Sequence, residues 1–171
     1  MGDPLDPAYR IGSLVSKSHF DKVRAYIEQA GAEKLRVAFG GGTEGGIFVE
    51  PTVVDGVGRD SRLFREEIFG PILSVTTFTT IGEAIALAND SIYGLAAAIY
   101  TGRLNNALRL SREIRAGVVT VNCFGEGDVT TPFGGYKESG FGGRDKSIWA
   151  HDQYTEIKTI WIDASRAGDA G

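Results

Sequence analysis

The sequence has very few of the residues that build metal or disulfide sites. It contains one cysteine, Cys123, and two histidines, His19 and His151, among 171 residues. A single cysteine cannot form a disulfide within the chain, and one cysteine with two distant histidines is no basis for metal binding. We therefore expect no metal site in this chain.

Long apolar runs and clusters of positive charge are also lacking. No apolar run approaches the ~18 residues that a membrane-spanning helix needs. The net charge is −4 at pH 7, without a basic cluster, so we expect neither nucleic-acid nor anionic-membrane binding. The first four residues hold no apolar signal region, which favours a cytoplasmic protein.

What the chain does have is the composition of a soluble globular domain, with 42% hydrophobic and 23% charged residues. The spacing of apolar residues predicts a helix from Ser16, capped by Ser18 and ended near Gly31. Its apolar face holds Phe20, Val23, Ile27 and Ala30. Residues 35–39 and 47–54 follow strand patterns.

A glycine-rich stretch between these two strands fits the pattern G-x-G-x-x-G at Gly40, Gly42 and Gly45. A dinucleotide site needs a helix after the last glycine, so that a phosphate meets the helix N-terminus. A strand pattern broken by Pro51 follows instead. We therefore favour a hairpin-like surface loop over a nucleotide-binding loop.

The acidic pair Glu66 and Glu67 stands just before Gly70 and Pro71. Pro71 fixes its own φ and disfavours helix at Gly70, so a helix that carries the acids must end there. Acids at such a junction either bind ligand hydroxyls or are simply solvated, and composition alone favours solvation.

Strand and helix patterns alternate after Pro71. Residues 72–78, 95–100 and 118–121 predict strands, with helices from Thr80 and Leu104 between them. This order predicts an α/β fold with a mainly parallel sheet and flanking helices. The continuous apolar run 95–100 indicates a strand covered on both faces.

The remainder of the chain is a long loop, residues 122–143, followed by a terminal strand. The loop leaves the end of a strand, where open α/β sheets place ligand sites. A short helix is expected over residues 145–150 and a strand over residues 154–162, which would form an edge that needs a partner. Residues 164–171 are expected to be disordered.

Few residues offer chemistry. Cys123 would need a base or a positive field to act as a nucleophile, and a small buried thiol is the commoner role. Phe124 and Phe133 either pack under the loop or line a pocket. Asp145, flanked by two basic residues, is most simply a solvated charge.

Five stretches, in order and with family-like spacing from about Asp3 to Ile162, resemble the aldehyde dehydrogenase superfamily. They are Glu66-Glu67-Ile68-Phe69-Gly70-Pro71, Asn89-Asp90-Ser91-x-Tyr93-Gly94-Leu95-Ala96, Ala116-Gly117-x-Val119-x-Val121-Asn122, Pro132-Phe133-Gly134-Gly135-Tyr136-Lys137-x-Ser139-Gly140 and Tyr154-Thr155-Glu156-Ile157-Lys158-Thr159. The resemblance implies the last third of an enzyme that oxidises an aldehyde to a carboxylic acid with NAD or NADP. The reaction would pass through a cysteine thiohemiacetal and a thioester.

The resemblance also implies a division of the chain. Residues 1–152 would be part of the catalytic domain, residues 153–163 the oligomerisation strand and residues 164–171 a tail. The Rossmann-type cofactor domain, the nucleophilic cysteine and the general base would lie upstream. The chain would then contain no catalytic residue, and we expect it alone to be inactive and to bind no cofactor.

Residue roles follow from the same resemblance. Glu67 matches a glutamate that binds the nicotinamide ribose, and Phe69 matches an aromatic residue beside that ring. Phe133 matches an aromatic residue of the substrate tunnel, and Phe124 begins the variable loop that shapes the tunnel. Asp145 lies near a proton-relay position, although an aspartate replaces the family's glutamate.

Substrate and partners are implied more narrowly. Details of the last stretches look most like bacterial enzymes that act on γ-glutamyl-γ-aminobutyraldehyde and related aminoaldehydes. Glu126 and Asp128 would suit an amine-bearing substrate, or they are solvated loop acids. The terminal strand implies a homodimer or homotetramer. The competing hypotheses are a non-catalytic oligomerisation module and, last, a hydrolase that uses Cys123.

Overall fold

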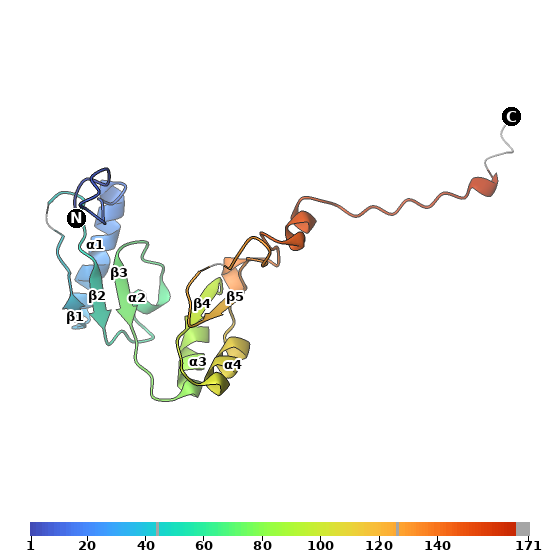
Figure 1. Ribbon diagram of the computed structural model, residues 1–171. Coiled ribbons are helices and arrows are strands. Elements are labelled where there is room, and N and C mark those ends of the chain that lie inside the picture. Colours follow the sequence, from blue (N-terminus) through green and yellow to red (C-terminus); the bar gives the residue numbers. More distant parts are fainter. Residues whose placement is uncertain (44, 126, 167–171) are drawn as a thin grey trace. The chain divides into compact units, whose positions relative to one another are not determined.

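The structure is a computed structural model that describes residues 1–43, 45–125 and 127–166 (Figure 1). The chain forms two compact units, Met1–Ser91 and Ile92–Gly171. Each unit combines helices with parallel strand pairing, and this confirms the predicted α/β class.

The first unit is a three-stranded sheet with three helices. Its elements are α1 (Lys17–Ala32), β1 (Arg36–Phe39), β2 (Thr52–Asp55), α2 (Arg62–Arg65), β3 (Ile72–Val75) and α3 (Ile81–Asn89). The strand order is β1-β2-β3, with β1 antiparallel to β2 and β2 parallel to β3.

Helix α1 begins after Ser16, whose side chain accepts a hydrogen bond from the His19 backbone amide at 3.2 Å. Ser16 has the extended backbone of a capping residue, whereas Ser18 is already helical. The helix continues through Gly31, and Lys34 takes the left-handed conformation at φ 57° that a terminating glycine usually adopts. The prediction of Ser18 as the cap was therefore wrong. The helix does end near Gly31, at Ala32, but Lys34 and not Gly31 takes the terminating conformation.

The core of this unit lies between α1 and the sheet. It contains the buried side chains Phe20, Val23, Tyr26, Ala30, Val49, Val54, Val57, Leu63 and Ile68. The predicted apolar face of α1 is confirmed except at Ile27, which is only partly buried. Tyr26, at 2% exposure, is buried on this helix instead.

The glycine-rich stretch joins β1 to β2, and this confirms the hairpin-like loop. The chain after Gly45 leads into β2 and not into a helix, so the nucleotide-binding alternative is excluded. Gly40 has φ +70°, and a Cβ there would meet the Pro51 carbonyl oxygen. The strand itself starts at Thr52, later than predicted, because Pro51 cannot donate a ladder hydrogen bond.

The second unit contains β4 (Ala96–Ile99), α4 (Leu104–Glu113) and β5 (Val118–Val121), followed by short 3-10 segments. These segments are η1 (Lys137–Ser139), η2 (Ile148–Gln153) and η3 (Ala164–Arg166). Strands β4 and β5 are parallel, with Ala96 opposite Val118. The described strands thus form two sheets, one in each unit, where the alternation had predicted one.

Strand β4 corrects another prediction. Ala96 and Ala98 are exposed, and Ile99 is the buried residue of this strand. An apolar run indicates how much surface a strand needs to bury, but burial itself depends on neighbouring elements. The expectation of a strand covered on both faces was therefore wrong for this chain.

The last part of the chain is extended. Residues 154–163 make no strand pairing with the described residues (Figure 1). Ala164–Arg166 form one 3-10 turn of the expected tail, and residues 167–171 lie outside the described residues. Among the described helices, none combines the length and apolarity needed to cross a bilayer.

Candidate functional site

The segment Glu66–Pro71 connects α2 to β3. Helix α2 ends at Arg65, and Glu66 is its cap residue, with an extended backbone whose amide donates to the Arg62 carbonyl. The two acids thus follow the helix, whereas we expected the helix to carry them. At the other end of the segment, the Pro71 carbonyl accepts a hydrogen bond from the Thr52 amide at 2.8 Å, so β3 begins at once.

Glu66 is an anchor of this segment. Its carboxylate pairs with the Arg62 guanidinium at 2.8 Å and 2.9 Å and accepts the buried Tyr26 hydroxyl at 2.7 Å. The hydrogen bonds from Arg62, followed by that from Tyr26, lower the pKa of Glu66 to about 2. Glu66 is therefore a structural anchor rather than the merely solvated acid we expected.

A second anchor joins the ends of α2 and α3. Arg65 forms a bidentate pair with Asp90, at 2.7 Å and 2.9 Å, and Arg59 donates to the same carboxylate. Hydrogen bonds from Arg65 and then Arg59 lower the pKa of Asp90 to about 2. In the sequence, Asp90 stands out only as part of the motif Asn89-Asp90-Ser91. Arg59 and Arg65 lie 31 and 25 positions before Asp90, so the sequence alone does not show that they share its carboxylate.

The side chains of Glu67 and Phe69, which follow Glu66 in the segment, take no part in either anchor. Ile68 is buried in the core, while its neighbours Glu67 and Phe69 are exposed. Glu67 makes no hydrogen bond or ion pair with the described residues. Phe69 is 69% exposed, and its backbone is left-handed at φ 60°. A free carboxylate beside an exposed ring can accept hydroxyl hydrogens and contact a flat ligand ring.

The second unit brings Phe133 and Asp145 together. Their backbones form an isolated antiparallel bridge with hydrogen bonds of 2.8 Å and 2.7 Å. Both residues line a cavity of about 260 Å³. The Lys146 ammonium lies 5.3 Å from the Phe133 ring centroid, and the Asp145 carboxylate accepts a 3.3 Å hydrogen bond from Gln153. Asp145 is exposed but has a defined partner.

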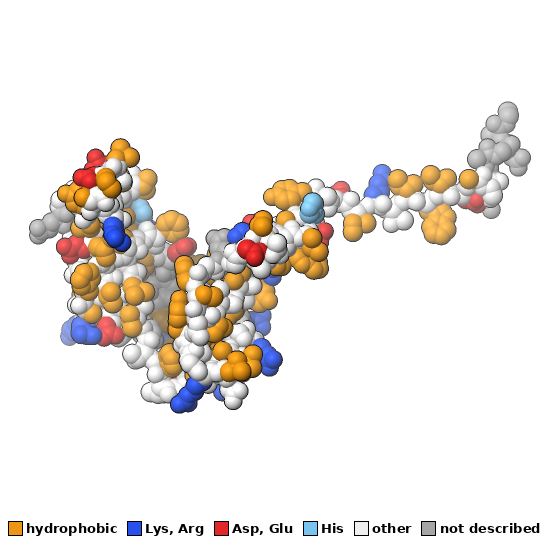
Figure 2. Space-filling model, in the orientation of Figure 1, with side chains coloured by type: hydrophobic (Ala, Val, Ile, Leu, Met, Phe, Trp, Pro, Cys, Tyr) orange, Lys and Arg blue, Asp and Glu red, His pale blue; other side chains and the backbone are white. Residues whose placement is uncertain are grey.

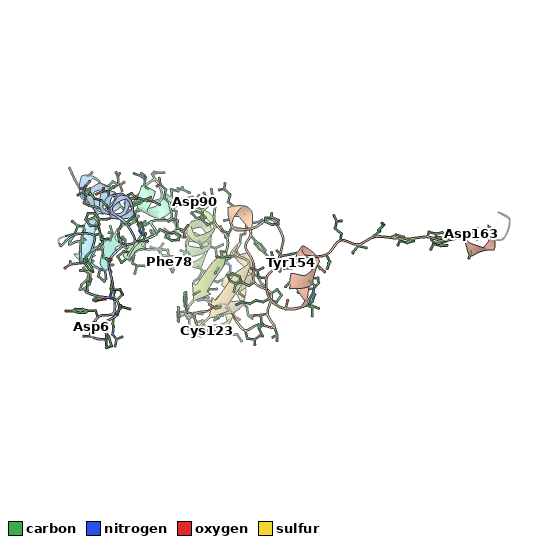
Figure 3. All side chains as sticks on the ribbon, turned by 90° about the horizontal axis from the view of Figure 1, so that it is seen from above. Asp6, Phe78, Asp90, Cys123, Tyr154 and Asp163 are labelled. Atoms are coloured by element: carbon green, nitrogen blue, oxygen red, sulfur yellow. The ribbon has the colours of Figure 1, made fainter. Side chains whose placement is uncertain are left out.

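The other candidate residues of the loop, among those that the structure describes, do not line the cavity of Phe133 and Asp145. Phe124 is 90% exposed and lines a small hollow beside β4 and β5, whose lining does not include Phe133. Asp128 accepts hydrogen bonds from the Thr130 amide and hydroxyl, and Glu126 lies outside the described residues. Cys123 is exposed (Figure 3), so the expectation of a buried thiol was wrong.

Comparison with known proteins defines the class of this chain. The sequence matches the aldehyde dehydrogenase family over residues 1–160. The chain therefore belongs to that family, as its five stretches predicted.

Individual relatives can be named. The chain is 78% identical over 165 residues to an aminoacetaldehyde dehydrogenase of Pseudomonas aeruginosa, covering 96% of this chain and 33% of that protein. It is 48% identical to the NADP/NAD-dependent aldehyde dehydrogenase PuuC of Escherichia coli, covering 94% of this chain and 32% of that protein. The chain thus spans about a third of the length of these relatives.

Solved structures agree in fold. The crystal structure of an indole-3-acetaldehyde dehydrogenase complexed with NAD+ has a TM-score of 0.87 at 50% identity, covering 94% of this chain and 33% of that chain. An NAD-dependent aldehyde dehydrogenase from Sinorhizobium meliloti has a TM-score of 0.89 at 39% identity, covering 97% of this chain and 33% of that one. Both the family resemblance and the fold class are therefore confirmed.

Proposed function

We propose that this chain is the C-terminal part of an NAD(P)-dependent dehydrogenase that oxidises an aminoaldehyde to a carboxylic acid. The observation that supports this most is the 78% identity to an aminoacetaldehyde dehydrogenase over nearly the whole chain. The dehydrogenase complexed with NAD+ supports a nicotinamide cofactor. The competing proposal, a non-catalytic oligomerisation module, draws support from the extended segment 154–162, which forms no strand pairing with the described part of the chain.

In this proposal Glu67 and Phe69 form part of the cofactor site. The bound nicotinamide would accept hydride from the substrate. The Glu67 carboxylate would accept hydrogen bonds from ribose hydroxyls, and the Phe69 ring would pack beside the nicotinamide. Their exposure, and the absence of a partner for Glu67 within the described residues, fit these roles.

The aldehyde site would use the second unit. Phe133 and Phe124 would line the path of the substrate. Asp145 would relay protons, and the side-chain amide of Gln153, which donates a hydrogen bond to it, would orient its carboxylate. The Asp128 carboxylate would attract the amine of an aminoaldehyde. We assign the nucleophile and the general base to upstream sequence, so the 171-residue chain alone should be inactive and bind no cofactor.

A grafted enzyme tests the proposal. This chain would replace the matching third of the Pseudomonas aeruginosa aminoacetaldehyde dehydrogenase, and the product should oxidise aminoacetaldehyde with NAD. Glu67→Gln should raise the KM for NAD about tenfold, since it removes a charged hydrogen-bond acceptor. The KM for the aldehyde should not change in Glu67→Gln. The control variant Glu28→Gln, at an exposed position, should have the same KM for NAD as the parent graft.

Two outcomes would count against the assignment. A folded graft without NAD-dependent oxidation would contradict the proposed function, and an unchanged KM for NAD in Glu67→Gln would contradict the role of Glu67. Aldehyde oxidation by the isolated chain would contradict only the placement of nucleophile and base upstream.

We further propose that residues 153–163 pair with a second copy of the protein to give a dimer or tetramer. Hydrophobic side chains line this extended segment (Figure 2), and Ile157 and Trp161 are 100% and 90% exposed. An unpaired apolar strand is a template for another strand. Light scattering should show that the double change Ile157→Lys and Trp161→Lys lowers the mass of the assembly, while Leu5→Lys does not. A monomeric parent protein would contradict this.

A further inference from the structure

One face of α1 contacts the segment Glu66–Gly70 at three successive levels. The Tyr26 hydroxyl donates to Glu66 at 2.7 Å. Val23 lies so close to Gly70 that a Cβ there would meet its methyl groups at 2.7 Å and 2.8 Å. His19 contacts the Phe69 carbonyl oxygen through its Nε2 atom at 2.7 Å. These α1 residues are spaced by four and three positions, so they share one side of the helix.

The protonation of His19 follows from its partner. A carbonyl oxygen only accepts hydrogen bonds, so Nε2 must carry a hydrogen and donate it. The other ring nitrogen, Nδ1, is buried and has no hydrogen-bond partner among the described residues. Within the described chain, the Phe69 carbonyl is thus the polar group that orients this ring.

His19 is itself held firmly. Its backbone amide donates to the capping side chain of Ser16, and the next residue, Phe20, is buried in the core. The imidazole therefore extends from a fixed point at the start of α1. A hydrogen bond from a fixed donor constrains the carbonyl that accepts it.

Phe69 needs such a constraint. Its φ of 60° belongs to the left-handed region, which a bulky side chain rarely adopts unless the surroundings impose it. The peptide that carries the Phe69 carbonyl also sets the direction of the exposed Phe69 ring. With Ile68 buried, this turn keeps Glu67 and Phe69 together on the exposed side of the segment.

We propose that His19 is a positioning residue for the cofactor site. Its hydrogen bond to the Phe69 carbonyl holds the left-handed turn and so preorganises Glu67 and Phe69 for a nicotinamide nucleotide. The proposal rests on the proposed function of Glu67 and Phe69, but the hydrogen bond acts within one unit of this chain and is testable without turnover.

Hydrogen exchange on the isolated chain tests the structural half. His19→Phe keeps a ring of similar size and removes the donor, whereas His19→Gln retains an ε-nitrogen donor at similar reach. Amides of residues 66–75 should exchange several-fold faster in His19→Phe and near the parent rate in His19→Gln, with residues 35–39 unchanged. The control His151→Phe should change neither. Equal exchange in all variants, or faster exchange throughout the first unit, would overturn the proposal.

NAD binding to the grafted enzyme tests the functional half. His19→Phe should raise the dissociation constant for NAD, measured by calorimetry, and the KM for NAD about five- to tenfold, whereas the aldehyde KM holds and His19→Gln recovers most of the loss. An unchanged NAD affinity in His19→Phe would overturn the proposal. A parent graft that fails to oxidise aldehyde would instead refute the proposed function, and the exchange result would still show whether His19 holds the turn.

Discussion

Gly70 lacks a side chain because Val23 of α1 occupies the space where one would be. A Cβ at this position would come within 2.8 Å of two methyl groups of a residue with 0% exposure. Gly70→Ala should therefore lower the free energy of unfolding by about 1–3 kcal/mol, the usual cost of overpacking a core. Urea unfolding measures the change.

Gly58 provides the matched control for that experiment. It lies in the same unit, is exposed, and has nothing within 4 Å of an added Cβ. Gly58→Ala should change the free energy of unfolding by less than about 0.5 kcal/mol. Equal losses in both variants would show that backbone freedom, and not contact with Val23, determines the effect at Gly70.

The carboxylates of Glu66 and Asp90 should make stability depend on acid. Their folded pKa values of about 2 lie below the ordinary 4.5 and 3.8, so the unfolded state binds more protons in this range. Their contribution is complete above pH 4.5 and is lost as the pH falls towards 2. The urea midpoint should fall over this window.

A single substitution isolates one part of that dependence. Asp90→Asn should reduce stability at pH 7, because Arg59 and Arg65 lose their charged partner, and should also flatten the decline between pH 4 and 2. Urea midpoints of parent and variant at several pH values make the comparison. A variant with the same acid dependence as the parent would show that Asp90 titrates normally in the folded chain.

At the residue scale, the motifs carried most of the information that the sequence offered. Glu67 and Phe69 were selected by resemblance and are exposed in the structure, and their role in a cofactor site stays a prediction. The roles of Tyr26, His19 and Asp90 were missed because each depends on a contact across 25 to 50 positions. Nothing in the local sequence of a tyrosine or histidine tells which backbone or carboxylate the fold will place beside it.

At the scale of elements, the first turn of α1 distinguishes two serines that the sequence could not. The Ser16 side chain accepts a hydrogen bond from the His19 amide, whereas the Ser18 hydroxyl pairs with the Ser16 hydroxyl at 3.1 Å. Ser16→Ala should lower the free energy of unfolding by about 1 kcal/mol, the typical value of an N-cap, and Ser18→Ala by less than about 0.5 kcal/mol. The reverse order in thermal unfolding would restore Ser18 as the cap.

Elements were predictable in type but less so in extent. Strands β1 to β5 and helices α1, α3 and α4 appear where periodicity placed them, since amphipathic spacing is a local property. The observed ends differ from the predicted ones where a single residue sets the boundary. Pro51 delays the start of β2, and the left-handed Lys34 follows the end of α1. The four-residue helix α2 is too short for periodicity to detect.

At the scale of the whole molecule, the two units differ in how much they bury. The first unit contains the cluster of nine buried side chains, whereas Ile99 and Leu110 are the buried hydrophobic residues of the second unit within the described chain. Amides that lie in well-buried elements open last. Strands β2 and β3 should therefore exchange amide hydrogens more slowly than β4 and β5. Native-state hydrogen exchange at low urea checks this, and equal rates would contradict it.

The architecture of the whole chain was only partly predictable. The alternation of strand and helix patterns after Pro71 predicted the α/β class correctly, because each of these patterns depends on nearby residues and several of them agree. It did not show that the described strands form two sheets, since strand partners depend on long-range contacts. The exposed face of β4 could not be foreseen either, because a sequence does not state which neighbours are present.

The left-handed turn at Phe69 has a consequence for anyone who would engineer this protein. Glycine and asparagine adopt that backbone at little cost, whereas phenylalanine does so against its preference. Because Phe69 is largely exposed, its packing contacts offset little of this backbone cost. Laboratory evolution for heat tolerance alone should therefore replace Phe69 early, and the more durable protein would lose the aromatic surface that we assign to the cofactor.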